Sequence, residues 1–573
     1  MKDPKIVPSN LVHWHPLKSF RTNTALLWTG RRAVLMLNPL LIIILVLAAT
    51  TAATAQTLKV LHYFGSTSGD AQQPTEELIA QGRDGNLYST SFVGGAYGLG
   101  TVFKVTPAGK LTVLYSFDGT QGSNPSGGLI LGTDGNFYGT TFLGGPLSNG
   151  TIFKITSTGL LTTLYNFTGG DDGGSPYAAP VQGADGNFYG STCACPYGEA
   201  YTGTVYRLTP SGELTTLYHL GHSPITDGVN PENQLVQGID GSFYGTATNQ
   251  GTYDRGTIFR ITPTGEFTPL HSFYDPSGSR TNAPLFQADD GNFYATAEHG
   301  GDSNYGVVYR ISPSGEYTAL HSFVFSDGNQ PFAGLVPAPD GNLYGTAVFG
   351  GVRNSGTIFR FGLDGSFSVL YNFDVGRGRE PYGTPVLHTN GSFYGTTFAG
   401  GSHGLGVFYR FDLGLAPFVR LVNTSGKVGT PIRILGQGFN NTTAVSFNGT
   451  PATFKVWADT FLTATVPNGA AGGFVTVTTP SGTLTSNEKF RVRPVILTVA
   501  PDSGPPGTPV VITGTSFTQT TKVVIGGVPA ASFTVDSDSQ VTATVPAGAS
   551  TGYVVLTTEG SKSRSPDTFV VTP

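Results

Sequence analysis

Cysteine, tryptophan, methionine and charged residues are all scarce in this 573-residue chain. The two cysteines, Cys193 and Cys195, lie in one Cys-Ala-Cys segment, which excludes a framework of disulfides. A structural metal site needs three or four ligands, and no group of histidines accompanies the two thiols. We therefore expect neither a metal site nor a bound cofactor.

The low charge of the chain argues against one class of partner. Charged residues make up 12% of the sequence, with 31 Lys and Arg against 36 Asp and Glu and a net charge of −5. Six of the basic residues and one acidic residue lie in residues 1–55, so the remainder is more acidic than the total suggests. That remainder has no basic patch for a phosphate backbone and no base-stacking motif. We expect no binding to nucleic acid.

Glycine and proline are abundant, with 81 and 38 residues. Both disfavour helices, because glycine is too flexible and proline lacks a backbone donor. The 38 Phe and 25 Tyr residues make the chain too apolar for disorder. The sequence therefore predicts an all-β protein with several domains, each large enough for a core.

Residues 1–55 have the layout of a secretory signal peptide with a long basic region. Arg31 and Arg32 precede an apolar stretch, and small residues ending at Ala55 follow it. The uninterrupted apolar run, 40–49, is shorter than the about 20 residues that span a bilayer. We expect cleavage after Ala55 and a location outside the cell, on its surface or in the periplasm. The alternative is a retained N-terminal anchor, the one case in which we expect membrane contact.

A motif of Asp-Gly, then Asn or Ser, then an aromatic residue or Leu, then Tyr recurs along the chain. Its seven copies are spaced by 50, 51, 55, 50, 50 and 50 positions and begin at Asp84, Asp134, Asp185, Asp240, Asp290, Asp340 and Asn390. Each repeat holds four short runs rich in β-branched and aromatic residues, with Asp-Gly and Gly-containing turns between them. Four antiparallel strands in a period near 50 predict one blade of a β-propeller, with a solenoid of stacked repeats as the alternative.

The two ends of the repeat array favour the propeller. The seventh repeat stops after 407–411 without a fourth strand, and the run 58–64 near the start of the mature chain matches the missing strand. A closed ring leaves no exposed sheet edge, whereas a solenoid gains nothing from a displaced strand. We predict a seven-bladed β-propeller over residues 56–412 that is closed by an N-terminal strand.

The second repeat carries a family resemblance. Asp-Gly-Asn-Phe-Tyr-Gly-Thr-Thr-Phe-Leu-Gly-Gly at 134–145, followed by Gly-Thr-Ile-Phe-Lys-Ile at 150–155, resembles the Gloeo/Verruco (GloVer) repeat of exported bacterial proteins. The resemblance extends over residues 57–412. It implies export and often a surface-sorting signal, and it implies no established chemistry. The period and the Gly-Gly pair are also similar to kelch repeats, but the kelch tryptophan is absent.

From Pro417 onward the sequence becomes rich in Val, Thr, Gly and Ser and contains two similar units. The pattern of residues 425–439 recurs at 503–517. Alternating short strands at this length predict immunoglobulin-like β-sandwiches. Both units resemble the IPT/TIG domain, which implies spacer or adhesive modules, and we place them at 413–493 and 494–573.

Candidate catalytic residues lie in the longer loops, because the short turns of a propeller leave little room for a site. The long loops follow the second strand of each blade or connect two blades, and they share one face. On that face the residues that break the repeat are Glu298, His299 and Asp302 in the fifth repeat, and Glu232 in the longest linker. A carboxylate and an imidazole on one rim can perform acid–base chemistry, but free variation of propeller loops explains the same residues.

Candidate binding residues are tyrosines, because the three tryptophans, Trp14, Trp28 and Trp457, all lie outside the propeller. Sugar rings can stack on tyrosines of the long-loop face, namely Tyr97, Tyr177, Tyr253 and Tyr305. The chain has no Gly-x-Ser-x-Gly elbow, phosphate-binding loop or His-Glu-x-x-His motif.

These features predict an exported, non-enzymatic binding or structural protein whose long-loop face contacts an extracellular polysaccharide or a surface protein. The competing hypothesis is a secreted carbohydrate-active enzyme, a glycosidase or lyase, with carboxylates on the propeller rim. A glycosidase needs two carboxylates about 5–10 Å apart, so convergence of Glu298, Asp302 or Glu232 on such a pair would favour the enzyme. A periplasmic assembly factor is a third hypothesis, since propellers often serve as docking platforms.

Overall fold

The computed structural model describes residues 56–74, 78–193, 203–221 and 226–573. These residues form strands joined by turns and bends, without a helix. In this part of the chain, therefore, no helix has the length and apolarity of a membrane span. The predicted leader at 1–55 lies outside the described residues.

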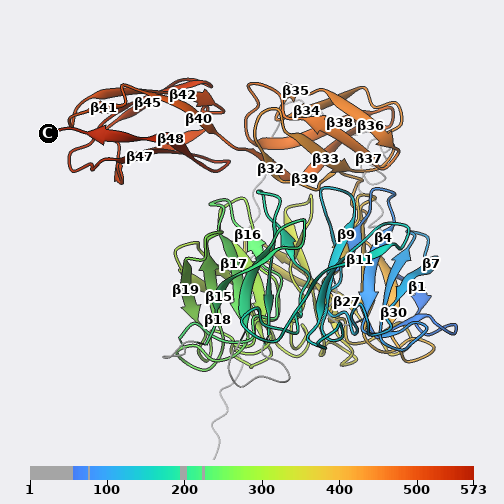
Figure 1. Cartoon of the computed structure of the whole chain (residues 1–573). Helices are drawn as coiled ribbons and strands as arrows, with labels where there is room; N and C mark the ends of the chain where they lie inside the picture. Colours follow the sequence, from blue (N-terminus) through green and yellow to red (C-terminus); the bar gives the residue numbers. More distant parts are fainter. Residues whose placement is uncertain (1–55, 75–77, 194–202, 222–225) are drawn as a thin grey trace, which may run out of the picture. The chain divides into compact units, whose positions relative to one another are not determined.

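Seven antiparallel four-stranded sheets form the blades of a propeller (Figure 1). Blade 1 comprises β3 (Ala80–Gln81), β4 (Leu87–Ser91), β6 (Thr101–Val105) and β7 (Leu111–Ser116). Blade 2 comprises β8 (Ile130–Leu131), β9 (Phe137–Thr141), β10 (Thr151–Ile155) and β11 (Leu161–Asn166). Blade 3 comprises β12 (Val181–Gln182), β13 (Phe188–Thr192), β14 (Thr204–Leu208) and β15 (Leu214–His219). A two-stranded ribbon, β2 (Ala71–Gln72) with β5 (Val93–Gly94), accompanies blade 1.

The remaining four blades have the same strand order. Blade 4 comprises β16 (Val236–Gln237), β17 (Phe243–Ala247), β18 (Thr257–Ile261) and β19 (Phe267–Ser272), and blade 5 comprises β20 (Phe286–Gln287), β21 (Phe293–Ala297), β22 (Val307–Ile311) and β23 (Tyr317–Ser322). Blade 6 comprises β24 (Val336–Pro337), β25 (Asn342–Ala347), β26 (Thr357–Gly362) and β27 (Phe367–Asn372). Blade 7 comprises β28 (Val386–Leu387), β29 (Ser392–Thr397), β30 (Val407–Asp412) and β1 (Thr57–Tyr63).

The N-terminal strand β1 is the fourth strand of blade 7. It runs antiparallel to β30, with Lys59 opposite Arg410 and Tyr63 opposite Val407. Phe64, which follows β1 directly, is fully buried in a core cluster with residues of blade 1. The all-β fold and its closure by a displaced strand, both predicted from the sequence, are confirmed.

Neighbouring blades pack through residues of their second strands. In five places a tyrosine contacts a phenylalanine of the next blade with ring centroids 3.9–4.8 Å apart: Tyr88–Phe137, Tyr138–Phe188, Tyr189–Phe243, Tyr244–Phe293 and Tyr344–Phe393. Tyr294 shares a core cluster with Leu343 between blades 5 and 6, and Tyr394 shares one with Leu87 between blades 7 and 1. Residues at equivalent positions therefore pack between the blades around a closed ring.

Glycine inside the second strand makes room for an aromatic ring of the third strand. Five such cross-strand pairs are Gly139–Phe153, Gly190–Tyr206, Gly245–Phe259, Gly345–Phe359 and Gly395–Tyr409. A Cβ atom added to Gly139 would lie 2.7 Å from the Phe153 ring, closer than carbon atoms approach. The repeated glycine is thus a packing requirement of the blade.

The Asp-Gly turns are structural in the first six blades. One oxygen of each aspartate accepts a backbone N–H two residues later, which fixes the hairpin. The other oxygen accepts the hydroxyl of the interblade tyrosine at 2.5–3.1 Å, in the pairs Asp84–Tyr88, Asp134–Tyr138, Asp185–Tyr189, Asp240–Tyr244, Asp290–Tyr294 and Asp340–Tyr344. Each motif therefore joins a turn to the contact between blades.

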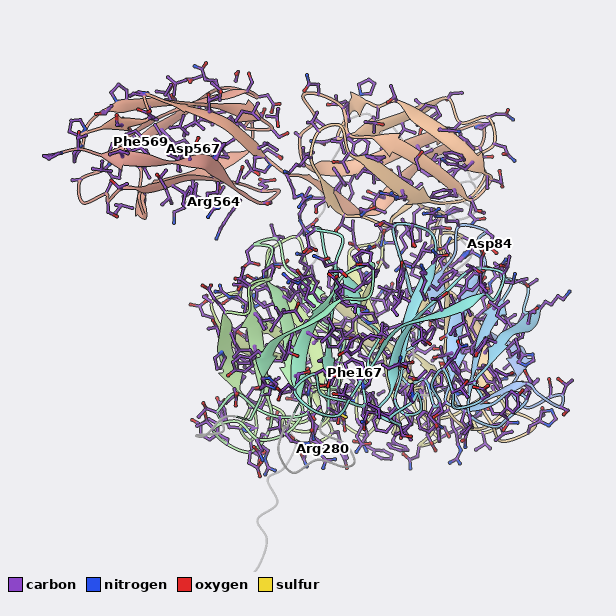
Figure 2. The ribbon with its side chains drawn as sticks, in the orientation of Figure 1. Asp84, Phe167, Arg280, Arg564, Asp567 and Phe569 are labelled. Atoms are coloured by element: carbon purple, nitrogen blue, oxygen red, sulfur yellow. The ribbon has the colours of Figure 1, made fainter. Side chains whose placement is uncertain are left out.

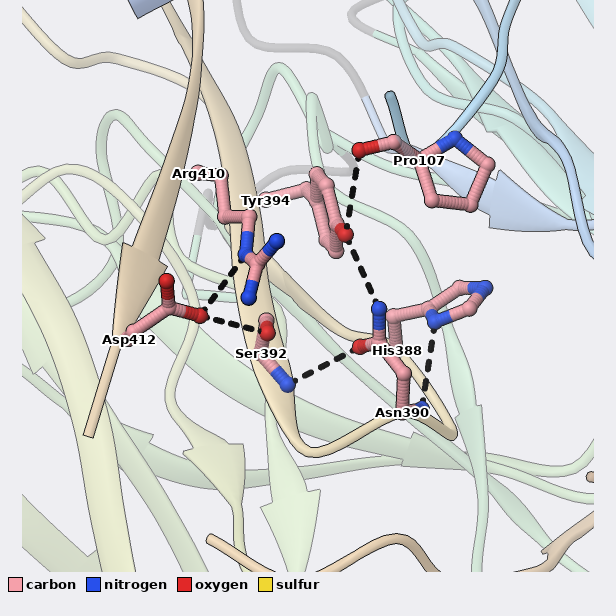
Figure 3. Close-up of polar contacts among 7 residues, drawn as sticks. All are labelled: Pro107, His388, Asn390, Ser392, Tyr394, Arg410 and Asp412. Carbon is pink, nitrogen blue, oxygen red and sulfur yellow. Dashed lines mark hydrogen bonds and ion pairs between the residues drawn. The ribbon is translucent and has the colours of Figure 1, made fainter. Parts of the chain in front are cut away.

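Blade 7 has Asn390 at this position and reverses the hydrogen bond (Figure 3). Its Nδ2 donates to the Tyr394 hydroxyl at 3.0 Å, and its Oδ1 accepts the Ser392 N–H at 3.0 Å. His388 accepts the Asn390 N–H through Nδ1 at 3.2 Å, so Nε2 carries the proton and donates to the Gly85 carbonyl at 3.0 Å. Burial lowers the pKa of His388, so a neutral imidazole links blade 7 to blade 1.

Two β-sandwiches follow the propeller, each made of a four-stranded and a five-stranded sheet. The first contains β31 (Arg420–Leu421), β33 (Pro431–Leu435), β37 (Phe461–Thr465) and β36 (Phe454–Ala458), and β32 (Ser425–Gly426), β39 (Gly482–Val492), β38 (Gly473–Thr479), β34 (Ala444–Phe447) and β35 (Thr450–Pro451). Buried residues such as Ile432, Phe447 and Phe490 form its core.

The second sandwich repeats the first in strand order. It contains β40 (Val495–Ala500), β42 (Pro509–Thr515), β46 (Gln540–Thr544) and β45 (Phe533–Ser537), and β41 (Ser503–Gly504), β48 (Lys562–Val571), β47 (Gly552–Thr558), β43 (Thr520–Ile525) and β44 (Val528–Pro529). Ile512, Phe517 and Phe569 lie in its core. The predicted immunoglobulin-like sandwiches are confirmed.

Candidate functional site

The two ends of the blades differ in loop length. Asp-Gly turns occupy one end, which we term the short-turn face. The loops between second and third strands and the linkers between blades occupy the other, the long-loop face. Figure 2 labels Asp84 and Arg280 at these opposite ends of the propeller.

Among the described residues, each linker on the long-loop face holds one non-glycine residue with left-handed backbone. These seven residues, which we term the crown residues, have φ between +49° and +61° and are Gln73, Asn124, Ser175, Asn230, Arg280, Gln330 and Glu380. In blades 2 to 7 the carbonyl of the crown residue accepts the N–H of the residue after the second strand. Asparagine adopts this backbone readily, but for other non-glycine residues it costs about 1 kcal/mol or more. Polar side chains at all seven positions therefore favour a role for those side chains.

Blade 5 departs from the other blades at adjacent positions. Its crown residue, Arg280, is the one cation among the seven. Glu298 and His299, directly after β21, stand where blade 6 has Val348 and Phe349. Thr281 stands where every other blade has proline after the crown residue, at Pro74, Pro125, Pro176, Pro231, Pro331 and Pro381.

Glu298 contacts His299 and also Asn282, which lies two residues after the crown residue. The Nδ2 of Asn282 donates a hydrogen bond to Oε1 of Glu298, and Nε2 of His299 lies 3.9 Å from Oε2. Glu298 is only 6% exposed. Burial raises the pKa of Glu298 to about 7, although the Asn282 hydrogen bond and the charge of Arg280 lower it. Burial, followed by the charges of Arg280 and Arg255, lowers the pKa of His299. At neutral pH the imidazole of His299 is therefore neutral, whereas burial favours the uncharged form of the Glu298 carboxyl.

The polar contacts continue into blade 4. The carbonyl of Thr281 accepts hydrogen bonds from Nδ2 of Asn233 and from Oγ1 of Thr246, the latter at 2.9 Å. In the described part of the chain, Oγ1 of Thr281 and Oδ1 of Asn282 are buried and lack a hydrogen-bond partner. Unpaired buried polar atoms cost about 1–3 kcal/mol each.

A polar pocket of about 590 Å³ opens between the long loops of blades 4 and 5. Its hydrogen-bond donors include Asn249, Arg255, Ser279, Arg280, His299 and Asn304. Two carboxylates, Asp254 and Asp275, also line it, and Asp275 forms an ion pair with Arg255 at 3.0 Å. Among the described residues the guanidinium of Arg280 has no hydrogen bond or ion pair, so it is available to a ligand.

A much smaller cavity marks the centre of the long-loop face. It encloses about 30 Å³, roughly the share of one water molecule. Linkers of all seven blades contribute to it, among them Ser126, Tyr177, Glu232, Asn282, Phe332 and Tyr382. Asn282 therefore lies between the central opening and the buried Glu298.

The structure groups some of the predicted residues and separates others. His299 lines the pocket and contacts the buried Glu298, whereas Glu232 and Tyr177 line the central opening. Asp302 is exposed on the loop that follows β21. Glu298 and Asp302 thus lie in one loop but differ in burial, which gives them different electrostatic environments.

Three of the predicted tyrosines lie in the loops between second and third strands. Tyr97 and Tyr253 are 65% and 58% exposed, and Tyr305 is half-buried. The ring of Tyr253 contacts that of Tyr274 edge to face with centroids 5.7 Å apart. Tyr253 directly precedes Asp254 and Tyr274 directly precedes Asp275, so this aromatic pair flanks the pocket.

Arg280, Asn282 and Tyr274 are not among the site residues predicted from the sequence. The first two could have been found by aligning the linkers, because Thr281 interrupts the run of prolines there. Cys193 is buried and its thiol donates to the Ser175 carbonyl at 3.3 Å, while Cys195 lies outside the described residues. The described chain contains no group of three or more His, Cys, Asp or Glu side chains placed to hold a metal ion.

Comparison with known proteins assigns the chain to a family. The model of the Gloeobacter/Verrucomicrobia repeat matches residues 46–193 and 157–346, together more than half of the chain, and the IPT/TIG domain model matches 417–492 and 494–571. No curated protein sequence matches the chain.

Several solved structures share parts of the fold at low identity. A fungal alcohol oxidase of the AA5 family in complex with copper is 15% identical over 76% of this chain and 98% of its own, with a TM-score of 0.42. A surface glycan-binding protein from Prevotella bryantii is 19% identical over 26% and 41%, with a TM-score of 0.21. A gluconolactonase from Xanthomonas campestris is 15% identical over 52% and 88%, with a TM-score of 0.33. Likeness at this level transfers neither activity nor ligand. By the family models, the chain belongs to the Gloeobacter/Verrucomicrobia repeat family and carries two IPT/TIG domains after its repeats.

Proposed function

We propose that the protein is exported and that the long-loop face of its propeller binds a glycan outside the cytoplasm. The observation that carries the proposal is the grouping of the departures of blade 5 beside one polar pocket. Arg280 and His299 line that pocket. Glu298, which is buried, contacts His299 on one side and Asn282 of the central cavity on the other.

Convergence distinguishes a site from neutral variation of the repeat. Substitutions without a function fall independently on the blades and are selected against where they bury unpaired polar groups. In blade 5 they fall side by side, bury a carboxyl group and leave Thr281 Oγ1 without a partner among the described residues. A binding site is the simplest reason to retain them together.

The chemistry of the pocket suits a sugar. Amide, hydroxyl and guanidinium donors can bind several hydroxyl groups, and the Tyr253–Tyr274 pair offers an exposed aromatic surface for the C–H face of a sugar ring. The signal-peptide layout of residues 1–55 and the two IPT/TIG domains support export and display of the propeller.

One observation favours a second candidate, a secreted carbohydrate-active enzyme. Glu298 is buried, hydrogen-bonded by Asn282 and has a pKa raised to about 7, which suits a general acid at neutral pH. Glycan hydrolysis also requires a second carboxylate at a suitable distance. Binding without cleavage therefore stays the first proposal.

A glycan array with the full-length protein tests the proposal, followed by mass spectrometry of the bound glycans. We expect binding with intact glycan. The double variant Glu298→Val/His299→Phe, which copies the residues of blade 6, should lose binding. Asp290→Asn, on the short-turn face of the same blade, should retain it. Retained binding by the double variant would contradict the proposed site, and cleaved glycan would favour the enzyme.

Export has a separate test. Residues 1–55 fused to a phosphatase that is active only outside the cytoplasm should give activity in intact cells. A version with Leu41→Arg and Ile44→Arg, which interrupts the apolar run, should give none. Activity of both fusions, or of neither, would contradict the predicted leader.

A further inference from the structure

The pocket between blades 4 and 5 has features that select an acidic sugar. We propose that it binds a uronate residue, whose carboxylate pairs with Arg280 and whose ring packs on Tyr253 and Tyr274. This inference rests on the proposed glycan-binding function of the long-loop face and specifies its ligand class.

The charges of the pocket leave one guanidinium for an anion. Arg255 is already paired with Asp275 at 3.0 Å, whereas Arg280 has no hydrogen bond or ion pair with the described residues. His299 is half-buried and neutral, and Asp254, the other charged group that lines the pocket, is exposed and available to sugar hydroxyls. A guanidinium binds a carboxylate through two parallel hydrogen bonds between opposite charges, whereas neutral hydroxyl groups supply no opposite charge.

The buried Glu298 does not neutralise the positive charge of Arg280. Glu298 is close enough to Arg280 for their charges to interact, but its burial favours the uncharged form of the carboxyl. Its hydrogen bond goes to Asn282. A carboxylate from a ligand can therefore pair with Arg280 with little competition from the protein.

The other blades show how specific this arrangement is. The remaining crown residues are neutral or acidic: Gln73, Asn124, Ser175, Asn230, Gln330 and Glu380. The equivalent blade 6 position, Gln330, has the same backbone conformation but carries no charge. The preference for an acidic sugar should therefore depend on Arg280 and should be absent from the matching position of blade 6.

The rim supplies the contact for the sugar ring. Tyr253 is 58% and Tyr274 46% exposed, and their rings meet edge to face at 5.7 Å. Their main chains lead directly into Asp254 and Asp275 of the pocket wall. Since the chain has a net charge of −5, long-range electrostatic attraction does not explain binding of an acidic polymer. An affinity that depends on the ligand carboxylate would therefore report its pairing with Arg280.

The experiment compares polygalacturonate, alginate and hyaluronan with their carboxyl-reduced forms, using the full-length protein. We expect at least one uronate polymer to bind at least 10-fold more tightly than its reduced form. Arg280→Gln, which copies Gln330 of blade 6, should abolish this preference and leave the melting temperature unchanged. The control Gln330→Ala should keep the preference for the uronate polymer, and Tyr253→Ala should weaken binding of both the uronate and the reduced form.

The outcomes separate this inference from the function beneath it. Binding of neutral or reduced glycans with equal affinity would overturn the uronate ligand and leave the glycan-binding function intact. A preference that survives Arg280→Gln would overturn the role of that residue. If no glycan of this panel or of the array binds, both the inference and the proposed function fail.

Discussion

The two ends of blade 5 differ in how far their residues match the equivalent positions of the other blades. At the short-turn face, Asp290 accepts the Tyr294 hydroxyl at 2.8 Å, a hydrogen bond that five other blades repeat. At the long-loop face, Arg280 and Glu298 occupy a repeated backbone frame with side chains that no other blade has there. In a repeat protein, repetition marks what the fold requires, and a group of adjacent exceptions marks a site.

Replacing Glu298 should give the largest change in stability. The folded state raises the pKa of Glu298 from 4.5 to about 7, so it holds the proton more tightly than the unfolded chain does. The free energy of unfolding therefore falls as the pH rises from about 4.5 to 7, by about 3 kcal/mol at about 1.4 kcal/mol per unit. Glu298→Gln removes this loss. In chemical denaturation the variant should match the wild type at pH 4 and exceed it by about 3 kcal/mol at pH 8.

Equal stability of the two proteins at pH 8 would contradict the buried environment of Glu298. The exposed Asp302→Asn in the same loop is the matched control, and it should change stability at neither pH.

This acid also shows how far the sequence leads. Glu298 and His299 could be selected in advance because they break an apolar pair of the repeat. An alignment of the linkers would also point to the segment around Asn282, but its contact with Glu298 could not be predicted, because that contact depends on the left-handed turn at Arg280. The pocket itself arises from three segments whose side chains vary in length, and no periodic signal encodes that shape.

The fold was far more predictable than the site. A period near 50 residues, four strand-like runs and a displaced strand at 58–64 determine a closed ring, because each feature repeats or completes a repeat. The role of Asp84 and its equivalents as turn formers followed from the same repetition. Their second role, anchoring the interblade tyrosine through its hydroxyl, required the three-dimensional register of strand and turn.

Removing the repeated aspartate should affect stability and not binding. Asp290→Ala loses the acceptor of the Tyr294 hydroxyl and of the Asn292 N–H, with an expected cost of about 1–3 kcal/mol. Glycan affinity should be unchanged. Burial raises the pKa of Asp290, but hydrogen bonds from Asn292 and Tyr294 lower it by more than burial raises it, so the pKa lies below its ordinary value. The contribution of the Asp290 carboxylate to the free energy of unfolding is therefore present at neutral pH and declines as the pH falls through the lowered pKa.

Denaturation at pH 7 and pH 3, with affinity measured in parallel, checks this pair of expectations. Loss of glycan affinity in a folded Asp290→Ala protein would show that the two ends of blade 5 are not independent.

Exchanging aspartate for asparagine should have the smallest effect and should depend on the third motif residue. Blade 7 combines Asn390 with Ser392, and blade 4 has Ser242 at the same place, so Asp240→Asn copies a natural combination. Asp134→Asn instead faces the side chain of Asn136, whose Nδ2 now donates to Asp134 at 2.6 Å. Two amide donors would then meet. We expect Asp240→Asn to cost less than about 1 kcal/mol and Asp134→Asn to cost about 1 kcal/mol more, measured by thermal denaturation. Equal costs would contradict this reading of the turn.

Hydrogen exchange with a bound uronate polymer tests the central claim most directly. With the polymer of the panel that binds most tightly, slowed exchange should be confined to residues 248–255, 275–282 and 298–304. The matching loops of blade 6, the Asp-Gly turns and the two sandwiches should exchange as in the free protein. Protection at the short-turn face or in the sandwiches, with none in those three segments, would contradict the assignment of the site to blades 4 and 5.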